Sequence, residues 1–253
     1  MRRYDRKKLP LKAFEKLELA LMPTRHESTI ITNISIKSEK IHDFLKENDV
    51  KIFAFVLYAC LKTVNEFPVL KRFVLNSQLY EHKNISVSTV MKRDKTVAGD
   101  STLAKLKFDP EDGLQDVQAK LNQATQQTRS GAGIEADKLI EGFGKMPTWM
   151  FKLAIKIMMR LDSWDLLPNS IIDDDPFHAT AVIANLGGID GFSVLHHLYN
   201  WGTASMFLTF GRLQDDGSLD VTFSVDERIS EGMVLFKALA YFTAIMEHPY
   251  DHV

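Results

Sequence analysis

Apolar and polar residues alternate with a period of two in several stretches of the chain, and such alternation predicts strands. In residues 28–36 the isoleucines fall on one face. The pair Asp216-Gly217 lies between two alternating stretches, which is a strong signal for a β-hairpin. A central sheet is therefore expected from residues 28–36, 73–80, 85–91, 180–184, 206–213 and 219–225, with a further strand at 103–108.

Helical spacing of apolar residues marks the segments between the strands. Residues 50–67 and 233–247 are apolar on nearly every side and each is followed by a proline, which is typical of buried helices. Ser38 and Asp49 stand where capping residues are expected. Further helices are expected at residues 1–21, 38–48 and 112–128, and a loop at 131–133.

Residues 147–167 form an unusual segment. Lys152, Lys156 and Arg160 recur every four residues, which places three cations in one narrow stripe of a helix. The rest of the helix is aromatic, aliphatic or methionine, so the segment fits peripheral contact with a membrane surface, or a partner's groove. The alternative is a helix packed on the domain, with its tryptophans buried and only the basic stripe in water.

Composition narrows the class of protein. The 253 residues are 45% hydrophobic, which suffices for a sizeable core, and the elements follow one another as in one domain over residues 1–253. The formal net charge of -2 argues against a nucleic-acid binder. The single cysteine, Cys60, excludes an intrachain disulfide and lies in an apolar run, as a structural thiol would. Without a secretory signal or a membrane-spanning apolar stretch, the expected location is cytoplasmic.

Three strings carry a resemblance to a known family. Residues 50–73 read VKIFAFVLYACLKTVNEFPVLKRF, residues 182–187 read VIANLG, and residues 226–232 read DERISEG. They resemble the buried helix and turn, the T-I-S-N-L-G string and the D-H-R-V-x-D-G motif of dihydrolipoamide acyltransferase catalytic domains, and more distantly chloramphenicol acetyltransferase. With no lipoyl or peripheral-subunit-binding domain in the sequence, and with the string HHLYNWGT, the chain resembles the free-standing bacterial and archaeal relatives.

The resemblance implies a fold, an assembly and a chemistry. The fold is α/β, the CoA-dependent acyltransferase fold, with a mixed β-sheet flanked by helices in a single domain. Family members form homotrimers or multiples of trimers, and their active site lies in a channel between neighbouring subunits, where CoA and the acceptor enter from opposite ends. A histidine removes the proton from a thiol or hydroxyl, and a serine or threonine stabilises the oxyanion.

Three motif positions depart from this pattern. Glu227 stands at the position of the histidine, Glu231 at that of the aspartate, and Ala184 at that of the hydroxyl residue. The family mechanism is therefore not expected to operate unchanged. The motif residues that are retained, and that would line the CoA channel with Ala184, are Asn185, Asp226, Arg228 and Gly232.

Other groups could replace the missing base. Carboxylates are weaker bases than imidazole, so Glu227 would need burial or the charge of Glu231 to strengthen it. The two glutamates are four residues apart and would be neighbours sharing a proton if the turn were helical. His196 and His197 precede a strand and are the weaker candidates. No metal is expected, because the aspartates at 173–175 near His178 read as an acidic loop.

Two functions follow from these observations. The first is a CoA-dependent acyltransferase-like protein that transfers or binds acyl groups from CoA thioesters with altered catalytic residues. The second is a catalytically inactive trimeric protein that binds CoA or acyl groups, or acts as a scaffold, with membrane-peripheral contact through residues 147–167. Whether the chain is an enzyme stays open at this level.

Overall fold

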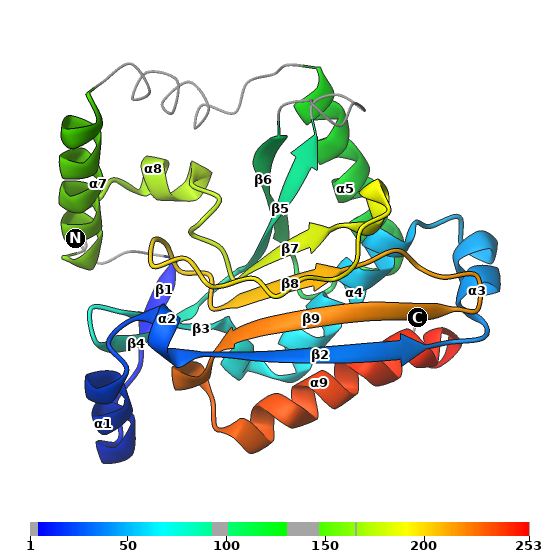
Figure 1. Cartoon of the computed structure of the whole chain (residues 1–253), viewed down its shortest axis with the longest axis horizontal. Coiled ribbons are helices and arrows are strands. Elements are labelled where there is room, and N and C mark those ends of the chain that lie inside the picture. The colour runs from blue at the N-terminus through cyan, green and yellow to red at the C-terminus, as the bar shows by residue number, and fades with distance from the viewer. Residues whose placement is uncertain (1–4, 93–100, 131–146, 165, 253) are drawn as a thin grey trace.

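The computed structural model describes residues 5–92, 101–130, 147–164 and 166–252. Its main sheet has six strands (Figure 1), of which β5, β7 and β8 are parallel to one another and all other neighbours antiparallel. The sheet is thus mixed, as the family resemblance implied. In spatial order its strands are β2 (Thr29–Lys37), β9 (Ser218–Asp226), β8 (Met206–Phe210), β7 (Ala181–Asn185), β5 (Ile85–Lys92) and β6 (Ser101–Phe108).

The main hydrophobic core lies between this sheet and the helices on one of its faces (Figure 1). Alternate residues of β9, from Leu219 to Val225, point into it, while Thr222 and Ser224 point to the opposite face. Phe55, Phe210 and Phe242 are fully buried there, and burying one such side chain stabilises the fold by about 1.5–3 kcal/mol. The covering helices are α3 (Ile41–Glu47), α4 (Ile52–Glu66), α5 (Leu114–Arg129) and α9 (Gly232–Glu247).

The predicted hairpin before β9 is confirmed. Gly217 has φ = 78°, a left-handed conformation that favours glycine. A Cβ atom at this position would lie 2.0 Å from the carbonyl oxygen of Ser38, so no other residue fits without a shift of the backbone. The turn is therefore fixed both by its own dihedral angles and by its packing against the start of α3.

The prediction of one central strand over residues 73–80 is wrong. This segment forms a hairpin of β3 (Arg72–Leu75) and β4 (Gln78–His82), which pairs with β1 (Arg6–Lys8) in a separate three-stranded sheet. Asn76 and Ser77 both have positive φ, 49° and 54°, as a two-residue hairpin turn requires. The turn contains neither glycine nor proline, which hid it in the sequence.

The prediction of a helix at the N-terminus was correct for only part of the segment. Residues 1–21 were expected to be helical, but Arg6–Lys8 is a strand and the helix α1 covers Ala13–Leu21. Pro10 lies between them. The remaining elements are the helix α7 (Thr148–Ser163) and the short elements α2 (Arg25–Ser28), α8 (Asn169–Asp174), η1 (Pro68–Lys71), η2 (Gly187–Ile189), η3 (Glu227–Ile229) and η4 (Pro249–Asp251). Residues 131–133, expected to form a loop, lie outside the described residues.

Neither predicted cap forms. The Ser38 hydroxyl donates to the carbonyl of Glu247, and α3 begins only at Ile41. Asp49 adopts a left-handed turn with φ = 51°. The N-cap residue of α4 is Lys51, and its backbone amide donates a hydrogen bond to the side-chain oxygen of Gln118 on α5, at 2.8 Å. The helix is thus capped from a distant element.

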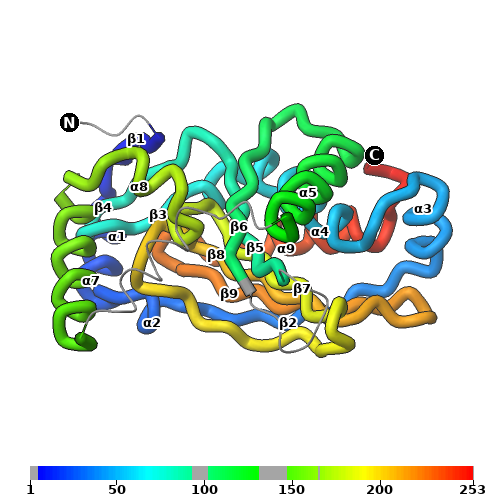
Figure 2. The backbone as a smooth tube through the Cα atoms, turned by 90° about the horizontal axis from the view of Figure 1, so that it is seen from above, coloured from blue at the N-terminus to red at the C-terminus, as the bar shows by residue number. Residues whose placement is uncertain are grey.

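The helix α7 lies at one end of the molecule, and α3 at the other (Figure 2). The helix α7 corresponds to the unusual segment at 147–167, and its one buried residue is Asp162. Asp162 Oδ2 lies 3.1 Å from His178 Nε2, and Asp175 Oδ2 lies 2.8 Å from His178 Nδ1. Burial disfavours a charged His178, but its hydrogen bonds to the two carboxylates outweigh this effect and raise its pKa. The buried imidazole of His178 thus links α7 to the domain through Asp162.

No helix in the described part of the chain combines the length and the apolar character needed to cross a membrane.

Candidate functional site

The end of β9 carries a buried ionic network. Asp226 is fully buried and accepts hydrogen bonds from Arg228 Nε (2.8 Å), Arg228 Nη2 (2.7 Å) and the Ser28 hydroxyl (2.9 Å). The Arg228 amide also donates to Asp226, which caps η3. Arg228 Nη1 donates to the carbonyl of Met22. The two residues of the DERISEG string therefore join the end of the sheet to the segment between α1 and α2.

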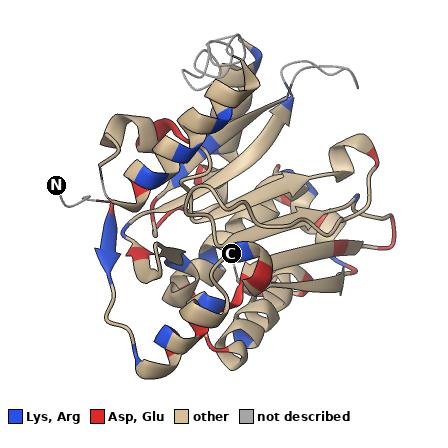
Figure 3. Ribbon diagram, turned by 60° about the vertical axis from the view of Figure 1, so that its left-hand side comes forward, with Lys and Arg blue, Asp and Glu red and all other residues tan. Residues whose placement is uncertain are grey.

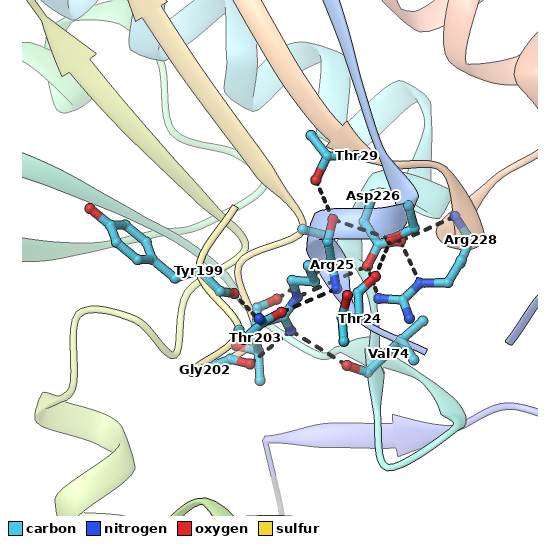
Figure 4. A network of polar contacts seen from close by, with 12 residues as sticks. Thr24, Arg25, Thr29, Val74, Tyr199, Gly202, Thr203, Asp226 and Arg228 are labelled. Carbon is cyan, nitrogen blue, oxygen red and sulfur yellow. Dashed lines mark hydrogen bonds and ion pairs between the residues drawn. The ribbon is translucent and has the colours of Figure 1, made fainter. Parts of the chain in front are cut away.

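A third member of this network is Arg25, which the sequence did not single out. Its guanidinium is buried and lies 4.0 Å from Asp226 (Figure 4). Burial lowers the pKa of Arg25 to about 10, while the charge of Asp226 acts to raise it. A single carboxylate thus lies between two buried arginines, which makes Asp226 the central charge of this network.

Arg25 also fixes the loop that follows the histidine pair. It donates to the carbonyls of Tyr199 (2.7 Å) and Gly202 (2.8 Å), as Figure 4 shows. Gly202 has φ = 81°, and a Cβ there would lie 2.1 Å from the carbonyl oxygen of Phe177. The HHLYNWGT string is therefore a loop that only glycine can close and that a buried arginine holds.

Glu227 lies in η3, next to this network, and is half-buried. Burial and the charge of Glu227 together raise the pKa of Glu18 on α1, and Glu15 and Glu231 contribute further. Glu231 is exposed, 4.0 Å from the Lys12 ammonium group. The expected continuous helical turn is absent, because Ser230 is extended (φ = -156°) and α9 begins only at Gly232. The nearby carboxylates therefore come from two elements, η3 and α1.

Ala184 and His196 line a common pocket of about 200 Å³. It opens on the sheet face opposite α4, next to Thr209 and Phe207. The His196 ring stacks on Phe207 with centroids 3.8 Å apart, and its Nδ1 lies 2.7 Å from the carbonyl oxygen of His197. His197 is exposed. We call this cavity the apolar pocket, because most of its lining is aliphatic or aromatic.

Asn185, the next residue of β7, lines a larger groove of about 540 Å³. Its side-chain oxygen accepts a hydrogen bond from the amide of Gly188, which shapes the glycine turn at the groove's edge. Lys51, Arg129 and Arg212 border the groove, and no acidic residue is among the described residues that line it. Apolar side chains supply the rest of its wall. We call it the basic groove.

Within one chain, these two groups of residues lie apart. Ala184 pairs with Thr209, and Thr209 with Thr222, whereas Asp226 lies four residues further along β9. At about 3.3 Å per residue, this is roughly 13 Å along the strands, in addition to two strand spacings of about 4.8 Å. The structure therefore places Ala184 and His196 in the apolar pocket and Asn185 in the basic groove. Asp226, Glu227 and Arg228 lie together at the end of β9.

Sequence reasoning missed Arg25 and the cations of the basic groove. Lys51, Arg129 and Arg212 come from three separate parts of the chain, and Arg25 contacts carbonyls more than 170 residues away. No local pattern marks such residues. Among the described residues, no group of three or more His, Cys, Asp or Glu side chains is arranged to hold a metal ion.

Comparisons with known proteins place this arrangement among known folds. No protein-family model matches the chain, and no curated protein matches it in sequence. Among solved structures, a probable dihydrolipoamide acetyltransferase from Listeria monocytogenes is similar over 95% of this chain and 94% of its own, with 15% identity and a TM-score of 0.59. A chloramphenicol acetyltransferase is similar over 96% and 98%, with 10% identity and a TM-score of 0.59.

The cubic core of a pyruvate dehydrogenase complex is also similar, over 97% and 93%, with 13% identity and a TM-score of 0.58. The likeness extends over nearly the full length of each chain, while the identities are low. This chain therefore has the fold of the dihydrolipoamide acetyltransferase catalytic domains and of chloramphenicol acetyltransferase.

Proposed function

We propose that this chain is an acyltransferase-like protein that binds CoA thioesters in the basic groove. The observation that carries the proposal is the position of the two cavities at the end of β7, where Asn185 lines the groove and the adjacent Ala184 lines the apolar pocket on the opposite face of the sheet. CoA has a phosphorylated end and a long neutral arm, which suit the three cations and the apolar wall. An acyl group passing the end of β7 would meet the apolar pocket.

The proposal includes a homotrimer. Glu227 and Ala184 lie too far apart in one chain to act on the same thioester, so a complete site needs residues from two chains. Large apolar side chains are exposed beside both places, as expected of surfaces that another subunit covers. They are Phe14, Leu17 and Leu21 on α1, Met233 and Phe236 on α9, and Phe192 and Leu195 near the apolar pocket. The similar cubic core is itself an assembly, which supports this part of the proposal.

Binding of CoA tests the proposal directly. The variant Lys51→Glu/Arg129→Glu reverses two cations of the basic groove and is expected to weaken CoA binding at least tenfold, or about 1.4 kcal/mol, in titration calorimetry. The control Lys83→Glu/Lys237→Glu makes the same charge change at exposed positions elsewhere and should bind as the wild type does. Light scattering should give three times 28.8 kDa for all three proteins. Equal affinities for the two variants, or a monomer that binds CoA fully, would contradict the proposal.

Whether the site also transfers acyl groups depends on Glu227. Glu227 is half-buried, and its charge contributes to the raised pKa of Glu18, so it lies close to another carboxylate and partly out of water. We expect Glu227→Gln to lower acyl-CoA-dependent CoA release by about 100-fold or more, as loss of a general base commonly does. The control Asp220→Asn changes an exposed carboxylate on the preceding strand β9 and should leave the rate unchanged. Equal background rates for the wild type and Glu227→Gln would instead assign the chain to the inactive, CoA-binding alternative.

A further inference from the structure

The helix α7 exposes most of its large apolar side chains to water. Trp149 is 68% exposed, Leu153 50%, Ile157 50% and Trp164 53%. At 100° per residue, these four side chains lie within about 80° of the helix circumference. Of the two alternatives for this segment, the observed exposure does not fit the helix packed on the domain with its tryptophans buried.

The cations of α7 occupy the adjoining sector. Lys152, Lys156 and Arg160 are all exposed and also lie within about 80° of one another. Figure 3 turns this end of the molecule towards the viewer and shows basic residues spaced along its ribbon. The guanidinium of Arg160 lies 4.7 Å from the Trp164 ring centroid, so the two sectors meet in a cation–π contact. The only acid of the helix, Asp162, points into the domain.

From this pattern we propose that α7 lies in the surface of a membrane that contains anionic lipids. The cations would contact headgroup phosphates and carboxylates, while the adjoining apolar sector enters the acyl boundary. Tryptophans at both ends of the helix suit this depth, since indole rings favour the region between headgroups and acyl chains. The inference does not depend on CoA binding, because α7 lines neither the basic groove nor the apolar pocket.

Charge favours a lipid surface over a second copy of the chain. If two subunits met through α7 about a two-fold axis, two sets of three cations would face each other beside the apolar contact, and like charges at close range are destabilising. An anionic bilayer satisfies the basic and the apolar sectors together. Asp162 and His178 hold α7 at the end of the molecule through the inner face of the helix. The basic and apolar sectors do not take part in this contact and can therefore meet a membrane.

Sedimentation of the full chain with vesicles tests the proposal. At low salt the wild type should bind vesicles of phosphatidylcholine with phosphatidylserine, and bind those of phosphatidylcholine alone much more weakly. The variant Lys152→Glu/Lys156→Glu/Arg160→Glu should bind the anionic vesicles roughly 100-fold more weakly, at about fivefold per charge. The control Lys37→Glu/Lys40→Glu/Lys46→Glu carries the same change on β2 and α3, at the opposite end of the molecule, and should bind normally.

A second variant tests the apolar sector. Leu153→Asn/Ile157→Asn keeps every charge and changes only exposed residues, so it should fold normally and still lose at least tenfold in vesicle binding. Brominated lipids should quench tryptophan fluorescence in the wild type and not in this variant. Wild-type binding that matches the charge-reversed variant overturns the proposal. So does a smaller particle mass for Leu153→Asn/Ile157→Asn in light scattering, which would assign α7 to contacts between subunits.

Discussion

Replacing Asp226 with alanine is expected to lower the free energy of unfolding by about 3–5 kcal/mol. The carboxylate is fully buried between Arg25 and Arg228 and accepts three hydrogen bonds from Arg228 and Ser28 side chains. Its removal would leave two buried guanidinium groups without a counter-charge, and such a loss costs far more than an exposed ion pair contributes. Urea denaturation followed by circular dichroism measures the change.

A neighbouring residue of the same type supplies the control. Asp220 lies on the same strand and is exposed, so Asp220→Ala should change the free energy of unfolding by no more than about 0.5 kcal/mol. Substituting Arg25 with methionine in the Asp226→Ala background removes one of the two uncompensated charges and should recover part of the loss. A loss below about 1 kcal/mol for Asp226→Ala would mean that the network contributes little to the fold.

The substitution His178→Ala is expected to have an effect of similar size, about 3–5 kcal/mol. It removes the imidazole that hydrogen-bonds to two carboxylates, and the buried Asp162 then loses this partner. Since Asp162 links α7 to the domain, proteolysis near α7 should accelerate together with the loss of stability. A variant that unfolds at a lower urea concentration while α7 stays protected would show that other contacts hold the helix.

This prediction carries a pH dependence with a definite sign. The pKa of His178 is raised in the folded protein, so its contribution to stability is complete below about pH 6.5, the ordinary value, and is lost as the pH rises through the raised value. Burial lowers the pKa of Lys105 to about 8, and Lys105 also titrates in this range. The test is therefore the difference between wild type and His178→Ala, which should shrink as the pH rises. A difference that grows with pH contradicts the assignment.

Much of the main sheet could be predicted because its strands alternate cleanly. Along β9 every second residue enters the core, and the Asp216-Gly217 turn has a local signature. The hairpin at Asn76 and Ser77 lacks that signature, since the usual second residue of such a turn is glycine, so two strands appeared as one. Local sequence patterns thus predicted the strands of the main sheet, and they failed where a turn lacks the residues usual for its type.

Of the candidate site, only the residues that lie in the family-like sequence strings could be predicted. Asp226 and Arg228, which the sequence predicted to line a CoA channel, form a buried ion pair with each other, and Asn185 lines the basic groove. Arg25 could not be found, because its partners are carbonyl groups that any sequence provides and that only the folded chain brings near. The sequence allowed α7 either to expose its apolar residues or to pack them on the domain. Only the exposed fractions of these side chains in the structure distinguish the two alternatives.

The pairing of β2 with β9 has a consequence for how the protein is made. Thr29 pairs with Asp226, so the second strand of this ladder leaves the ribosome almost two hundred residues after the first. At about 5–20 residues per second, β2 must wait roughly 10–40 s for its only partner in the sheet. During this time the segment TIITNISIK is an unpaired, β-rich stretch of nascent chain. Newly synthesised chains should therefore depend on chaperones until the C-terminal hairpin emerges.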